Sequence, residues 1–126
     1  MPHHHASHRV AMITGAGSGI GQATAQRLAA EGYRLTLAGR RESALQETAR
    51  LIGDADTLVA VCDVTNADAV HAIVANTISQ FGRLDVVVNN AGISRTTALA
   101  DVTLSEWREV MAANVESIML VSQAAL

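Results

Sequence analysis

The sequence predicts an α/β protein with a doubly wound parallel sheet. Short, nearly all-apolar segments of strand length alternate with segments of helical periodicity, in the order strand–helix three times, then strand, loop, helix. Because a helix separates each strand from the next, the strands must be parallel, with right-handed crossovers and helices on both faces. The 126 residues are 49% apolar but only 2% aromatic, which suits small aliphatic side chains packing helices onto such a sheet. The expected strand order is 3-2-1-4, with ligands bound where the order reverses.

The first expected strand, Arg9–Thr14, runs into a glycine-rich turn, Thr14–Gly21. The turn has the spacing Thr-Gly-x-x-x-Gly-x-Gly, and Ile20 stands where the commonest fingerprint, G-x-G-x-x-G, has its third glycine. Glycine lets the backbone turn sharply and approach a ligand. The helix that follows offers unpaired N–H groups and a positive dipole end to an anion. We therefore expect a diphosphate at this turn; the alternative is a plain glycine turn that binds nothing.

The next elements follow from periodicity and from helix stop signals. A small-residue helix with Ile20 on its packed face is expected to end at Gly32, followed by a strand over Tyr33–Ala38. A helix over Glu42–Ile52 with its stop at Gly53 and a strand over Thr57–Cys62 come next.

The second half of the chain continues the alternation. Either Thr65 or Asn66 can cap a helix that ends at Gly82. The fourth strand is expected over Leu84–Val88. A polar loop then runs to Asp101, and Thr103 or Ser105 caps one last helix that continues through Val121.

Arginines follow the second expected strand, where dinucleotide folds usually carry an acidic residue for the adenosine ribose hydroxyls. The sequence there is Gly39-Arg40-Arg41. A carboxylate would repel a 2′-phosphate, whereas a guanidinium binds it through two charge-assisted hydrogen bonds. Arg40 therefore favours NADP, with NAD as the alternative cofactor; Arg41 can equally be a solvated turn residue.

Polar groups also follow the third and fourth expected strands. Asp63 can accept a hydrogen bond from an adenine amino group or act as a turn or cap residue. In Asn89-Asn90-Ala91-Gly92 the two amides can bond to backbone and fix the strand ends, while the small residues leave room for a cofactor ring. Asn114 lies on an apolar face of the last helix, where an unbonded amide is costly. It is either a satisfied core asparagine or an active-site amide that holds water or kinks the helix.

Several functional classes are excluded or disfavoured. The chain contains no lysine, which rules out a Walker-type phosphate loop and a lysine nucleophile. Nine scattered arginines and a net charge of −3 give no basic stripe for nucleic acid. No apolar run approaches the length of a membrane span. The lone cysteine, Cys62, is expected in the core and fits a reducing compartment, hence the cytoplasm. The histidine-containing segment Met1–His8 is interpreted as a disordered leader or tag remnant, and no metal site is expected.

Together these motifs resemble the short-chain dehydrogenase/reductase family over about Arg9 to Leu126. The resemblance rests on Thr14-Gly15-x-x-x-Gly19-x-Gly21, Asp63-Val64, Asn89-Asn90-Ala91-Gly92 and Asn114-Val115, in this order and spacing. It implies a Rossmann-type fold in an NAD(P)-dependent oxidoreductase that acts on a small carbonyl or alcohol substrate and forms a tetramer or dimer.

The resemblance also implies residue roles. The diphosphate would be surrounded by Gly15, Ser18, Gly19, Ile20 and Gly21. The adenine would meet Asp63 and Val64, and the nicotinamide-side ribose would meet Asn90, Ala91 and Gly92. Asn114 would match the family's catalytic asparagine, which supports a proton-relay water.

The chain departs from the family in its acid–base groups. The catalytic serine and the Tyr-x-x-x-Lys pair of the family are missing, since the one tyrosine, Tyr33, is followed four residues later by Leu37. We therefore expect residues 9–126 to be an incomplete dinucleotide-binding domain, truncated after the helix that follows the fourth strand and inactive alone. The alternatives are a non-catalytic nucleotide-binding module or truncated pseudoenzyme and, less compatible with Arg40, an S-adenosylmethionine-dependent methyltransferase.

Overall fold

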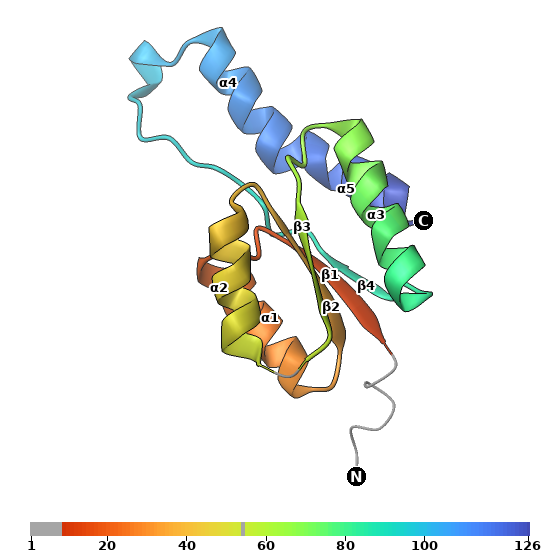
Figure 1. Ribbon diagram of the computed structural model, residues 1–126. Coiled ribbons are helices and arrows are strands. Elements are labelled where there is room, and N and C mark those ends of the chain that lie inside the picture. The colour runs from red at the N-terminus through yellow and green to blue at the C-terminus, as the bar shows by residue number, and fades with distance from the viewer. Residues whose placement is uncertain (1–8, 54) are drawn as a thin grey trace.

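The computed structural model describes residues 9–53 and 55–126, so the interpretation of Met1–His8 as a leader lies outside the described residues. Its centre is one parallel sheet of four strands (Figure 1). The strands are β1 (Val10–Thr14), β2 (Arg34–Gly39), β3 (Thr57–Val61) and β4 (Val86–Val88). They lie in the order β3-β2-β1-β4, which confirms the predicted order and the doubly wound class.

Helices cover both faces of the sheet (Figure 1). On one face lie α1 (Gly19–Ala30) and α2 (Glu42–Ile52); on the other lie α3 (Ala67–Phe81) and α5 (Ser117–Ala125). Successive side chains of a strand point to opposite faces. Ile13 of β1 accordingly packs in the cluster that includes Ala25 of α1 and Leu45 of α2, whereas Met12 packs with Val70 of α3 and Val121 of α5.

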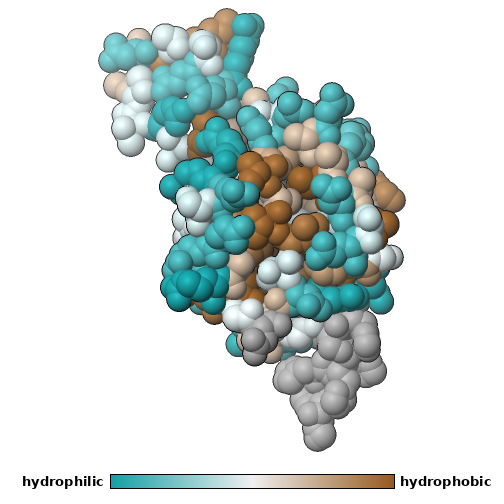
Figure 2. All heavy atoms as spheres, viewed as in Figure 1, coloured by the Kyte–Doolittle hydropathy of each residue, from teal (hydrophilic) through white to brown (hydrophobic). Residues whose placement is uncertain are grey.

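The centre of the sheet is better enclosed than its edges. All five residues of β1 are buried, because β1 has a strand on each side and helices on both faces. In the part of the chain that the structure describes, β3 and β4 are the edges of the sheet. Figure 2 shows apolar surface in the middle of this view, where Figure 1 draws β3 between α2 and α3, and Val61 at the end of β3 is 52% exposed.

The helix ends agree with the caps expected from the sequence. The Asn66 side chain accepts from the Ala69 N–H at 3.0 Å, and Gly82 ends the same helix in the left-handed region with φ of 80°. The Thr103 hydroxyl accepts from the Glu106 N–H at 3.1 Å, so Thr103 is the cap and Ser105 is not. Each side chain satisfies one of the N–H groups that a helix start leaves without a partner.

Helical structure does continue through Val121 as expected, but it is not regular. A 3₁₀ turn (Leu99–Asp101) precedes α4 (Leu104–Met111), and a π turn over Ala112–Glu116 separates α4 from α5. Figure 1 shows α4 leading away from the body of the molecule, while α5 lies beside α3. Within the described ranges, no helix has the length and apolar character needed to cross a membrane.

Asp85 fastens the start of β4 to the start of β1. Its Oδ2 accepts from the Val10 N–H at 2.9 Å, and its own N–H donates to the Val10 carbonyl at 2.9 Å. Arg83 donates to both carboxylate oxygens, at 2.8 and 2.7 Å. The Val10 N–H is thus bonded to a side chain and not to the backbone of β4, which begins at Val86 and not at the predicted Leu84. The Arg83 hydrogen bonds, followed by the Val10 N–H, lower the pKa of Asp85.

The substitution Asp85→Ala tests this fastening. A carboxyl whose folded pKa is lowered stabilises the fold above its unfolded pKa of about 4, and the contribution disappears as the pH falls further. We expect the variant to lose about 1 kcal/mol of unfolding free energy at pH 7, since the pair is partly exposed and screened. Urea unfolding from pH 3 to 7 measures this. The difference should shrink below pH 4, and Asp85→Asn, which keeps an oxygen for the Val10 N–H, should lose less; a pH-independent difference would contradict the account.

Candidate functional site

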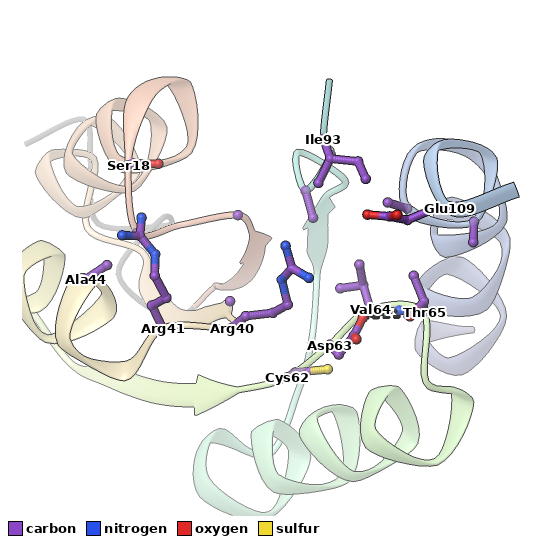
Figure 3. Close-up of a pocket in the computed structure, with 17 residues that line it drawn as sticks. Ser18, Arg40, Arg41, Ala44, Cys62, Asp63, Val64, Thr65, Ile93 and Glu109 are labelled. Carbon is purple, nitrogen blue, oxygen red and sulfur yellow. Dashed lines mark hydrogen bonds between the residues drawn. The ribbon is translucent and has the colours of Figure 1, made fainter. Parts of the chain in front are cut away.

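A cavity of about 580 Å³ opens at the carboxyl ends of the strands (Figure 3). Its wall comes from the turn between β1 and α1, the segments that follow β2, β3 and β4, and the end of α4 with the π turn. Crevices at this edge of an open parallel sheet are where α/β folds bind ligands. The volume lies within the range of about 300–1,000 Å³ typical of small-molecule sites.

Residues singled out from the sequence gather here. The cavity is lined by the predicted positions Gly15, Ser18, Arg40, Asp63, Val64, Ala91 and Gly92. The other predicted positions, Gly19, Ile20, Gly21, Asn90 and Asn114, do not line it. Ile20 was expected on the packed face of its helix, and this is wrong: its side chain is 78% exposed.

The glycine turn has its shape because two backbones come together. A Cβ on Gly21 would lie 2.1 Å from the Gly15 carbonyl oxygen and 2.5 Å from Asn90 Nδ2. Gly15 itself has φ of 64°, a conformation that side chains disfavour. The first turn of α1 therefore packs directly on the turn that precedes it, and Gly21 is needed for close packing and not as a wall of the cavity.

The start of α1 has no side-chain cap. Ser18 is its N-cap, but the Ser18 side chain makes no capping bond, and the first turn holds no acidic residue. The first N–H bonded within the helix region is that of Gln22, to the Ser18 carbonyl at 3.1 Å. The positive end of the helix dipole is thus left for a ligand.

Charged side chains surround the other part of the cavity. Figure 3 shows Arg40 extending into the space above Asp63, and Arg41 extending toward Ser18. Asp63 Oδ1 accepts from the Thr65 N–H at 2.9 Å and from the Thr65 hydroxyl at 2.7 Å. The two Thr65 bonds lower the pKa of Asp63, and the positive charge of Arg40 lowers it further. The interpretation of Asp63 as a turn residue is therefore confirmed. Asp63 also lines the cavity, and its contact with an adenine stays a prediction.

The segment after β4 is tied to the glycine turn. The Thr14 hydroxyl oxygen accepts from the N–H groups of Asn90 and Ala91, both at 2.9 Å, and Asn90 Nδ2 donates to the Gly15 carbonyl at 3.2 Å. Asn90 thus bonds to backbone as expected. Asn89 instead donates from Nδ2 to the hydroxyl of Ser122 in α5, at 3.3 Å.

Asn114 uses both ends of its amide on one residue. Its Oδ1 accepts from the Ile93 N–H at 2.7 Å, and its Nδ2 donates to the Ile93 carbonyl at 2.8 Å. The residue lies in the π turn, and a Cβ on Gly92 would approach its Oδ1 to 2.9 Å. The amide is therefore satisfied, and the helix is locally widened at this point. A catalytic role for Asn114 stays a prediction.

Sequence reasoning missed part of the wall. Beyond Arg41, the lining residues outside the predicted set are Gly17, Gly39, Ala44, Cys62, Thr65, Ile93, Glu109, Ala112 and Ala113. Glu109, Ala112 and Ala113 share one helical face, and the small pair just before Asn114 was the signal that could have placed that face at the cavity. Glu109 also forms an ion pair with Arg95 of the loop.

Cys62 lies both in the core and in the wall of the cavity. Cys62 is 3% exposed, as the core prediction requires, and burial, with a smaller contribution from the charge of Asp63, raises the pKa of its thiol. Among the described residues, no group of three or more histidine, cysteine, aspartate or glutamate side chains could hold a metal ion.

The pair Gly21→Ala and Gly19→Ala tests the close packing at the turn. The Gly21 substitution forces a methyl group into the Gly15 carbonyl, and we expect a loss of about 3 kcal/mol of unfolding free energy. Gly19 has φ of 54° but open space around a Cβ, so its substitution should cost only about 1 kcal/mol of backbone strain. Chemical denaturation compares them; equal losses would contradict the contact.

Asn114→Ala tests the amide clamp on Ile93. Removing it leaves a half-buried N–H and carbonyl without partners, so we expect about 2 kcal/mol of lost unfolding free energy. Asn89→Ala, which removes one long bond at an exposed position, is the control and should change stability by about 0.5 kcal/mol or less. Thermal unfolding measures the loss of stability in both variants. Similar losses would mean that the two Asn114–Ile93 hydrogen bonds contribute little.

Comparisons with known proteins agree with this geometry. Residues 9–126 match the family model for short chain dehydrogenases. An uncharacterised oxidoreductase of Staphylococcus aureus is 37% identical over 118 residues, covering 94% of this chain and 51% of that protein.

Solved structures give the same result. A short-chain type dehydrogenase/reductase from Mycobacterium marinum has a TM-score of 0.90 and 35% identity, covering 93% of this chain and 48% of its own. A 3-ketoacyl-(acyl-carrier-protein) reductase from Brucella melitensis, complexed with NADH, has a TM-score of 0.87 and 34% identity, covering 91% and 47%. The chain spans about half the length of these relatives. The Rossmann-like sheet, the glycine turn and the family match together show that this chain belongs to the short-chain dehydrogenase/reductase family.

Proposed function

We propose that this protein is an NADP-dependent oxidoreductase that transfers a hydride between the nicotinamide and a small carbonyl or alcohol substrate. Membership of an oxidoreductase family supports the reaction class. The observation that carries the choice of NADP is the pair Arg40 and Arg41 in the cavity wall directly after β2. Two guanidinium groups there suit a 2′-phosphate.

The residues of the cavity fit such a cofactor. The glycine turn and the N-terminus of α1 suit the diphosphate, because Ser18 makes no capping bond and the first turn of α1 holds no acidic residue. Asp63 and Val64 stand where an adenine would meet the arginine side of the cavity, and Ala91 and Gly92 leave space for the second ribose. The bound nicotinamide would supply the hydride. The chain's own contribution is to bind the dinucleotide and orient it.

Proton transfer is the part of the reaction for which this chain lacks groups. It contains no lysine, and its one tyrosine, Tyr33, lies just before β2. We propose that these 126 residues bind the cofactor without turning over a substrate, with Asn114 in a supporting role. The same observation favours a second candidate, a non-catalytic nucleotide-binding module. NADPH oxidation with a panel of ketones separates the two: binding without turnover in the whole protein would favour the module.

We further propose assembly into a dimer or tetramer in the cytoplasm. Exposed apolar side chains along α4, the π turn and α5 support an association surface; they include Trp107, Val115 and Met119, which are 56%, 52% and 52% exposed.

Arg40→Ala tests the choice of cofactor. We expect NADPH affinity to fall about tenfold or more through loss of charge-assisted bonds to the 2′-phosphate, with NADH affinity unchanged. Arg41→Ala should have a smaller effect. Arg27→Ala, which breaks only an exposed ion pair with Glu31 in α1, is the control and should alter neither affinity. Titration of reduced-nucleotide fluorescence measures both constants. An equal loss for NADH and NADPH, or an unmodified protein that prefers NADH, would overturn the NADP assignment.

A further inference from the structure

A buried hydroxyl connects α2 to the glycine turn. Thr48, in α2, is fully buried, and its Oγ1 lies 2.8 Å from the Ala16 carbonyl oxygen and 3.3 Å from that of Ala44. The single proton serves the nearer carbonyl better, so Thr48 donates chiefly to Ala16. The same oxygen accepts from Gln22 Nε2 at 3.1 Å. Thr48 thus joins α2, the turn and the first turns of α1.

The Ala16 residue is held at both of its polar groups. Its N–H donates to the Ala38 carbonyl at the end of β2, at 3.1 Å, and its carbonyl accepts from Thr48. The turn also rests on α2 through Gly17, where a Cβ would lie 2.8 Å from the Ala44 Cβ. The position of the turn is therefore set by β2 and α2 as well as by its own glycines.

The hydrogen bond from Thr48 also determines where the next N–H points. A trans peptide is planar, with its C=O and N–H pointing in opposite directions. Because the Ala16 carbonyl points to Thr48 in the interior, the Gly17 N–H points away from Thr48. Gly17 lines the cavity, and no acceptor among the described residues bonds its N–H.

We propose that Thr48 is a positioning residue for the cofactor: its hydroxyl fixes the Ala16–Gly17 peptide so that the turn presents its N–H groups to the diphosphate. This proposal rests on the proposed function, since it names the residue outside the cavity wall that orients the anion site. Without the hydroxyl, the Ala16 carbonyl loses its buried donor, and the peptide is free to rotate toward other partners. The turn then loses conformational entropy when the ligand binds, and this loss weakens binding.

The test compares Thr48→Val, which keeps the shape of the side chain but lacks the hydroxyl, with Thr48→Ser, which keeps the hydroxyl. Thr77→Val is the matched control, since Thr77 is also fully buried and bonds Thr36 at 2.8 Å, but on the opposite face of the sheet. Gln22→Ala removes only the support of the Thr48 hydroxyl and remains informative if Thr48→Val does not fold. The binding of two ligands to the purified protein is measured: NADP⁺, and adenosine 2′-monophosphate, which has no diphosphate.

We expect Thr48→Val to weaken NADP⁺ binding about tenfold and to leave adenosine 2′-monophosphate within about threefold of the unmodified protein. Thr48→Ser should restore NADP⁺ binding, Gln22→Ala should weaken it about threefold, and Thr77→Val should lower the thermal midpoint without changing the ratio of the two affinities. The proposal is overturned if Thr48→Val binds NADP⁺ normally, if it loses both ligands equally, or if serine does not rescue.

A second measurement does not depend on the ligand. Amide hydrogen exchange of the ligand-free protein should be faster in Gly15–Gly19 of Thr48→Val, and unchanged there in Thr48→Ser and Thr77→Val. Unchanged exchange in Thr48→Val would also overturn the positioning role. If the unmodified protein binds neither nucleotide, the proposed function fails, and the exchange result still decides whether Thr48 holds the turn.

Discussion

The hydroxyl of Thr14 is the interaction on which the site depends. It stands at the end of β1 and accepts from the N–H groups of Asn90 and Ala91, which follow β4. These two strands are neighbours in the sheet although they are distant in the chain. By joining their carboxyl ends, Thr14 fixes the gap between the glycine turn and the small residues Ala91 and Gly92. These residues form one side of the cavity wall.

The distribution of charge around the cavity supports the proposal that it binds NADP. The N-terminus of α1 carries no acidic residue in its first turn, and Arg40 and Arg41 add two positive charges at the end of β2. Asp63 adds a negative charge, but its Oδ1 already accepts two hydrogen bonds from Thr65. A ligand with several phosphate groups and a hydrogen-bond donor at one end matches this pattern. A nucleoside with an unmodified ribose would leave the arginines without a partner.

The loop after β4 is held by side chains and not by a strand partner. Asn114 bonds both polar groups of Ile93, Arg95 pairs with Glu109, and the Thr97 hydroxyl donates to Glu106 at 2.6 Å. These three contacts attach the loop to α4 and the π turn over most of their length. The π turn carries the Asn114 amide, which satisfies both polar groups of the Ile93 backbone.

The sequence by itself determined the class of fold, the strand order and most helix boundaries. Val10–Ile13 is apolar throughout and is buried throughout, and α2 buries one side, with Leu45 and Thr48. Asn66, Gly82 and Thr103 act within a few residues of their own backbone. The tertiary structure decided what depends on distant partners. Asn114 in the π turn bonds Ile93, Asp85 just before β4 bonds Val10, and Ile20 at the start of α1 is exposed. Glu109 lines the cavity and Thr48 bonds the glycine turn for the same reason: local periodicity sets the face of a helix, but only packing decides what that face meets.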